Sequence, residues 1–250
     1  LFFSVAVLTF SSCSDDDDDN GGGWVPTKTL GAFVLNTGSW GGDDAVLSFY
    51  DTEDKEITAD IFSKVNSKRL GAGAQDVIVY GSKVYVSMTE SNLIYVLDKS
   101  GKIISEDIKP KNESGQPLQP RSLVAHNGKV YVSMYGGYVG RIDTTSLAMD
   151  AKVEVGPYPE QMTVANNKLY VATSSYIQHV SNVISIVDLA NFQTAEEKEV
   201  GLNPTDIVSD TKGNVYVICK GNYGDVKSAV KKIDTSGTVT EITKASMMAI

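Results

Sequence analysis

Short apolar alternations separated by polar turns recur along most of the chain. Three tight polar turns, at residues 81–83, 127–129 and 166–168, each lead into a tetrad with tyrosine at its second position. Asn-Gly and Asn-Asn pairs tolerate the positive φ that a two-residue hairpin needs, so these turns predict β-hairpins. A fourth tetrad follows a longer turn, and the four tetrads cover residues 84–87, 130–133, 169–172 and 215–218.

A second marker is an apolar alternation that closes on aspartate. These aspartates are separated by 47, 45, 45 and 46 residues, and they are Asp51, Asp98, Asp143, Asp188 and Asp234. Five copies at so even a spacing indicate a repeated unit of about 46 residues. We expect each carboxylate to cap the turn into the following strand by accepting hydrogen bonds from nearby backbone. An aspartate array that binds metal is the alternative.

A third marker is the strand start before each tetrad, which carries proline at 120, 159 and 204. Proline suits the start of a strand but not its interior. Each unit therefore predicts four antiparallel strands, a to d, with a polar turn between a and b, a loop between b and c, and the aspartate after c. Such units are typical of β-propeller blades, and no helix-length apolar period occurs after residue 24.

The predicted fold is therefore all-β, a β-propeller of four-stranded antiparallel blades with about five blades in this chain. The first unit starts at a strand b, residues 32–35, and residues 245–250 resemble the start of another strand a. We expect the chain to be a fragment of a larger propeller, truncated at its C-terminus.

The first residues predict export and a lipid anchor. Residues 1–12 are mainly apolar and too short to span a bilayer, which fits an incomplete signal peptide. Ser11 and Ser12 precede Cys13, which resembles the lipobox of bacterial lipoproteins except that Phe10 stands in place of the usual leucine. We expect lipidation at Cys13, and we expect Cys219, within an apolar strand, to be buried and to form no disulfide.

Residues 13–29 form the predicted tether between this anchor and a propeller domain at residues 30–250. Five of the charges behind the net charge of −9 are the run from Asp15 to Asp19, and glycines follow it. Such a segment cannot pack and stays solvated. The run resembles the acidic export signal of surface lipoproteins in some Gram-negative bacteria, which implies an exposed outer-membrane location; a plain spacer is the alternative. The chain has no basic stripe, so nucleic acid is not an expected partner.

The repeat resembles a known group. Its succession of a proline-led strand a, an Asn-Gly-Lys turn, a Val-Tyr-Val-Ser strand b and an Ile-Asp ending is similar to the YVTN/YncE-type propellers of surface lipoproteins (DUF5074-like). The resemblance covers residues 30–250 and implies seven blades in the intact protein. It implies little about function, because propellers serve many chemistries.

Blade geometry places the b–c loops and the d–a connections at one end of a propeller, and aromatic or polar residues gather in these segments. Aromatic rings supply rigid contact area, and amide or charged groups supply directional hydrogen bonds. We therefore predict that this end binds a broad ligand with polar edges, such as a sugar or a large cofactor. The alternative is that the rings only pack the blade ends. The candidate residues are Trp40, Gln75, Arg121, Tyr135, Tyr138, Gln161, Tyr176, Asp206 and Tyr223.

Catalysis finds little support in the sequence. His126 falls at an a–b turn and His179 in a long loop, and no metal-binding cluster, phosphate loop or nucleophile elbow is present. The expected protein is not an enzyme and carries no catalytic cofactor.

The acidic tether, the Trp40-Gly41-Gly42 loop and the tyrosine-rich repeats resemble the cobalamin-capturing BtuG-type surface lipoproteins. That resemblance implies a small-molecule ligand, cobalamin, and a TonB-dependent outer-membrane transporter as partner. An adhesion propeller that binds a protein or a glycan is the alternative.

Overall fold

The computed structural model describes residues 30–174, 181–193 and 195–245. Within these residues the secondary structure is almost entirely antiparallel β-sheet, with one six-residue helix. The chain divides into two compact units between Ile108 and Lys109, and each is described by itself. The expectation of an all-β chain of repeated sheets is confirmed.

The first unit holds two three-stranded sheets, blades 1 and 2. Blade 1 has the order β1 (Gly31–Asn36), β2 (Val46–Asp51), β3 (Ile57–Thr58). Blade 2 has the order β4 (Ala74–Tyr80), β5 (Lys83–Met88), β6 (Leu93–Asp98). In place of a fourth strand, blade 2 has two isolated bridges, Ile94 to Ile108 and Leu97 to Ile103. Helix α1 (Ile61–Asn66) follows β3 and buries Phe62 completely. The sequence pattern did not predict this helix.

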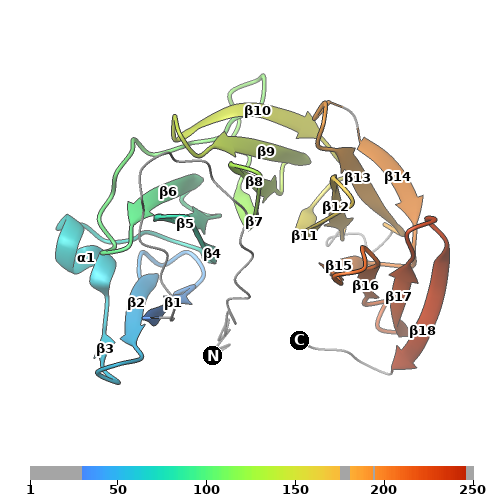
Figure 1. The fold of residues 1–250 in the computed structure, drawn as a ribbon, viewed down its shortest axis with the longest axis horizontal. Coiled ribbons are helices and arrows are strands. Elements are labelled where there is room, and N and C mark those ends of the chain that lie inside the picture. The colour runs from blue at the N-terminus through green and yellow to red at the C-terminus, as the bar shows by residue number, and fades with distance from the viewer. Residues whose placement is uncertain (1–29, 175–180, 194, 246–250) are drawn as a thin grey trace. The chain divides into compact units, whose positions relative to one another are not determined.

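The second unit holds three sheets that each have the predicted four strands. Blade 3 is β7 (Pro120–His126), β8 (Lys129–Met134), β9 (Tyr138–Asp143) and β10 (Ala148–Glu154). Blade 4 is β11 (Pro159–Ala165), β12 (Lys168–Thr173), β13 (Val183–Asp188) and β14 (Ala195–Glu199). Blade 5 is β15 (Pro204–Ser209), β16 (Val215–Cys219), β17 (Ser228–Ile233) and β18 (Val239–Ala245). In Figure 1 the first strands β7, β11 and β15 are neighbours, and each starts a sheet that ends at β10, β14 or β18.

Apolar side chains between blades 4 and 5 form a continuous core. Tyr170, Ala172 and Ile184 of blade 4 pack in one buried cluster with Val217 and Cys219 of blade 5. Cys219 is a free cysteine and only 2% exposed. The prediction of a small buried hydrophobic residue at this position is confirmed.

The antiparallel pairings give each blade two distinct ends. We call one the loop end; in the second unit it holds the starts of β7, β11 and β15, and the ends of β8, β12 and β16. The opposite, turn end holds the a–b turns and the c–d turns that follow the repeated aspartates. The assignment of the b–c loops and d–a connections to one end is therefore confirmed within the blades of this unit.

Each repeated aspartate caps its turn as predicted. In all five copies Oδ1 accepts a hydrogen bond from the backbone N–H two residues further on, at N···O distances of 2.7–2.9 Å. Nowhere in the described residues do three or more His, Cys, Asp or Glu side chains form a group that could hold a metal. Turn capping therefore accounts for the aspartate in each repeat.

Asp210, a carboxylate at the turn end, is expected to make the stability of the protein depend on pH. The Asn214 side chain, together with the Asn214 and Lys212 backbone N–H groups and the Tyr216 hydroxyl, donates to Asp210 and lowers its pKa from 3.8 to about 2. A carboxylate whose pKa is depressed by folding stabilises the protein above its unfolded pKa and loses that contribution as the pH falls through its folded pKa.

We therefore expect the free energy of unfolding to fall from pH 3.8 towards pH 2, and to fall less in Asp210→Asn. Urea midpoints measured across this range test the prediction. Identical pH slopes in the two proteins would contradict it.

Candidate binding site at the loop end of the second unit

Every strand a that the structure describes begins with the same irregularity. The residues before the strand starts, Gly73, Gln119, Tyr158 and Asn203, all have positive φ, between 47° and 66°. Their carbonyls accept hydrogen bonds from the residue that follows strand b, at 2.8–3.2 Å. The register then shifts within the first residues of each strand a. Such bulges redirect side chains and are common beside functional sites.

Between blades 3 and 4 these redirected residues form an ion pair. Arg121, at the second position of β7, pairs through Nε with Oε2 of Glu160, at the second position of β11. Glu160 is 6% exposed, and its Oε1 accepts a hydrogen bond of 2.9 Å from Ser174 Oγ. The Arg121 side chain is 30% exposed, so it is partly accessible to solvent. A buried carboxylate thus fixes a partly exposed cation at the loop end.

Two tyrosines complete this network. The Arg121 guanidinium lies 4.7 Å from the centre of the Tyr135 ring, a cation–π contact. Tyr158 meets Tyr135 edge-on, with ring centres 5.7 Å apart and planes at 69°. Ser174 donates its backbone N–H to the Tyr158 carbonyl at 3.2 Å. Tyr158 has a φ of 47°, an uncommon conformation for a bulky residue. We call Arg121, Tyr135, Tyr158, Glu160 and Ser174 the Arg121 network.

A parallel hydrogen bond joins the same two strands one residue further on. Ser122 Oγ donates to Gln161 Oε1 at 2.6 Å. Ser122 is buried, whereas Gln161 is exposed. Gln161 therefore presents a side-chain amide, already oriented through its oxygen, beside the Arg121 network. The combination of aromatic edges, a guanidinium and an amide suits contact with a planar ligand that carries polar groups.

Within the second unit the structure brings part of the predicted site together. Arg121, Tyr135 and Gln161 lie in or beside the Arg121 network. Tyr138 instead starts β9, where the Lys152 ammonium of β10 lies 5.6 Å from its ring centre. Asp206 accepts from its neighbour Thr205 at 2.8 Å.

Two other predicted residues, Tyr223 and Gln75, belong to other blades. Tyr223 is 68% exposed in the b–c loop of blade 5. Gln75 is half-buried at the start of β4, in the first unit. Cys13, Tyr176 and also His179 lie outside the described residues.

Trp40, also in the first unit, lies in a b–c loop that hydrogen bonds fix at the residues before and after it. Its side chain is 87% exposed. The Gly41 N–H donates to both carboxylate oxygens of Glu90, at 3.1 and 3.2 Å. Asp44 accepts from the Ser39 N–H and hydroxyl, both at 2.7 Å, and these bonds lower the pKa of Asp44. The fold therefore presents a single indole to solvent on a preorganised turn.

Sequence reasoning missed Tyr158, Glu160 and Ser174. Glu160 occupies the same repeat position as Arg121, directly after the strand-start proline. Opposite charges at equivalent positions of consecutive repeats could have predicted this ion pair, because the first strands of adjacent blades lie side by side. Tyr158 gives no comparable signal, since its role depends on the left-handed backbone before the proline.

The repeat and the order of strands in its sheets define the class of this protein: it is a β-propeller. The chain belongs to the family described as "Domain of unknown function (DUF5074)", whose model matches residues 30–249. Comparison with curated proteins finds no match. Among the described residues no helix is long and apolar enough to cross a membrane.

Solved structures share this fold at low sequence identity. Hydrazine synthase from Kuenenia stuttgartiensis is 18% identical with a TM-score of 0.62, over 85% of this chain and 62% of that one. The dihydro-heme d1 dehydrogenase NirN, in complex with DHE, is 11% identical with a TM-score of 0.63, over 88% and 45%. A chain of a nidogen/laminin complex is 12% identical with a TM-score of 0.58, over 86% and 75%. This chain thus spans less than two thirds of the length of the hydrazine synthase and NirN chains. The likeness to these structures establishes the fold alone.

Proposed function

We propose that this protein is a surface-exposed binding propeller that captures a solute at the loop end of its blades for a TonB-dependent outer-membrane transporter. The observation that carries the proposal is the Arg121 network, in which a buried glutamate and two tyrosines hold a partly exposed guanidinium. Such preorganisation reduces the entropy lost on binding. The proposal includes a lipid anchor at Cys13, and it assigns the protein no catalytic activity and no catalytic cofactor.

Cobalamin is the proposed ligand. A corrin ring is broad and planar, and its rim carries amide side chains. Tyr135 and Tyr158 offer apolar edges to such a ring, while Arg121 and Gln161 offer donors to its amides. Aromatic residues and arginine are the side chains that most often dominate binding energy at interfaces.

Replacing Tyr135 by leucine is expected to weaken cobalamin binding about tenfold, equivalent to ~1.4 kcal/mol, because the flat ring and its support of Arg121 are both lost. Isothermal titration calorimetry with cyanocobalamin measures the change. The matched control is Tyr216→Leu, a half-buried tyrosine near the turn end of β16, which should bind like the wild type. No binding heat for the wild type at micromolar concentrations would remove cobalamin as the ligand.

The Trp40 loop favours a second candidate function, the recognition of a glycan on another cell or protein. Sugar rings stack their apolar faces on exposed indoles, and the nearby Asp43, Asp44 and Glu90 provide carboxylates that accept hydroxyl hydrogen bonds.

For this candidate, Trp40→Ala should abolish retention of the protein on a glycan array, and Tyr135→Leu should leave it unchanged. The reverse ranking of the two variants, or no retention of the wild type, argues against glycan binding.

A further inference from the structure

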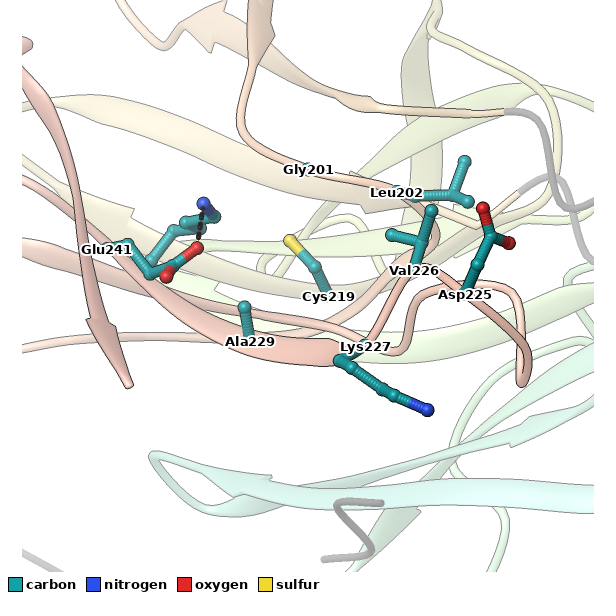
Figure 2. Close-up of a pocket in the computed structure, with 9 residues that line it drawn as sticks. Gly201, Leu202, Cys219, Asp225, Val226, Lys227, Ala229 and Glu241 are labelled. Atoms are coloured by element: carbon teal, nitrogen blue, oxygen red, sulfur yellow. Dashed lines mark hydrogen bonds and ion pairs between the residues drawn. The ribbon is translucent and has the colours of Figure 1, made fainter. Parts of the chain in front are cut away.

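A pocket of about 360 Å³ lies on blade 5 and shares no residue with the Arg121 network. Figure 2 shows its lining, which comes from four parts of the chain. Cys219 of β16 and Ala229 of β17 are both buried and form an apolar floor. Gly201 and Leu202, in the connection from β14 to β15, and Val226, in the b–c loop, also line it. The volume lies within the range of roughly 300–1,000 Å³ that small-molecule sites occupy.

The charged groups at this pocket already have partners. Lys231 Nζ pairs with Glu241 Oε2 at 2.7 Å. Asp225 Oδ1 accepts from Asn222 Nδ2 at 2.7 Å, and Lys227 Nζ donates to the Gly224 carbonyl at 3.0 Å. Two acidic and two basic side chains therefore balance one another. An ionic ligand would gain little net attraction here and would lose its hydration, so the pocket favours an uncharged molecule.

Gly201 keeps the pocket open. A Cβ at this position would lie 3.2 Å from Cys219 Sγ and 3.3 Å from Lys231 Cε, so any side chain would press on the lining. Cys219 stays a neutral thiol, because burial raises its pKa to about 12. A neutral, polarisable sulfur makes favourable contacts with aromatic rings.

We propose that this pocket is a second small-molecule site, which takes a compact, uncharged compound of one or two rings. The proposal stands on the lining, volume and charge balance of blade 5. It does not depend on the ligand of the Arg121 network or on the function proposed above.

The test uses 5-fluoroindole, an uncharged bicyclic probe, observed by fluorine NMR with the full chain. A dissociation constant on the order of 1 mM is expected for a probe with so few atoms, and binding should broaden the fluorine signal. Ala229→Leu fills the floor and should abolish the broadening. Ala148→Leu, the same change at an exposed alanine of β10, should leave it intact. Absent broadening with the wild type, or equal broadening with Ala229→Leu, overturns the proposal.

A second measurement covers the case in which Ala229→Leu fails to fold. In Cys13→Ser, Cys219 is the remaining thiol of the chain. Its reaction with methyl methanethiosulfonate should slow about threefold when the probe is present at twice its dissociation constant, because occupied pockets shield the sulfur. A rate that the probe does not change refutes occupancy of this pocket.

Discussion

Replacing Glu160 by alanine is expected to lower the free energy of unfolding by about 3 kcal/mol, because it removes the buried carboxylate that pairs with Arg121. Glu160 is 6% exposed and accepts from both Arg121 and Ser174. Breaking a buried ion pair costs ~3–5 kcal/mol, and the lower end applies since the Arg121 side chain is 30% exposed and water screens part of its charge.

Guanidinium chloride unfolding of the wild type and Glu160→Ala measures this loss. The control is Glu241→Ala, which breaks the more exposed pair with Lys231 and should cost less than about 1 kcal/mol. Restoring part of the lost stability by adding Arg121→Leu would show that the broken pair with Arg121 is the cause. Equal losses in Glu160→Ala and the control would mean that the pair is not buried in solution.

Truncating Phe62 to alanine is expected to cost about 4 kcal/mol in the free energy of unfolding, the usual loss when a fully buried phenyl ring is removed. Phe62 is the completely buried residue of α1, and its ring centre lies 4.9 Å from that of Tyr95. The cavity would open in the core of the first unit, where Leu47, Leu70 and Leu97 also lie.

The matched control is Val65→Ala on the same helix, at a side chain that is 42% exposed. It should change stability by less than about 0.5 kcal/mol, because surface substitutions rarely do more. Chemical unfolding of both variants, followed separately by far-ultraviolet circular dichroism and tyrosine fluorescence, distinguishes the two outcomes. A small loss for Phe62→Ala would show that α1 does not pack on its unit in solution.

Periodic features of this chain could be predicted because they depend on local chemistry. Asn127-Gly128 forms a hairpin turn wherever strands flank it, and Asp143 caps its own turn through atoms a few residues away. The helix α1 could not be predicted this way. Six residues cannot sustain a helix in isolation, so its existence depends on the tertiary burial of Phe62 and on the Asp60 cap. The missing fourth strand of blade 2 is equally non-local.

The candidate site also contains residues that local sequence identifies and residues that only tertiary structure places. Arg121 and Tyr135 could be identified because polar and aromatic residues at blade ends point to binding. Their partners could not be placed from type alone. Glu160 has the same repeat position as Arg121, and Ser174 follows a strand b. Glu160 reaches the network where a bulge and a left-handed residue redirect the start of β11, and Ser174 reaches it through hydrogen bonds to Tyr158 and Glu160. Tertiary geometry, rather than residue type, also separates Tyr138 from Arg121, since Tyr138 packs with Lys152 on the outer strands.

The most direct test of ligand capture at the loop end is fluorine NMR of protein that carries 3-fluorotyrosine, titrated with cyanocobalamin. Single Tyr→Phe substitutions assign the signals of Tyr135, Tyr158 and Tyr216. Capture at the loop end predicts that the Tyr135 and Tyr158 signals shift and saturate together, while the Tyr216 signal, near the turn end, stays unchanged. Shifts confined to Tyr216, or no shift of Tyr135 and Tyr158 with ligand in excess, would contradict it.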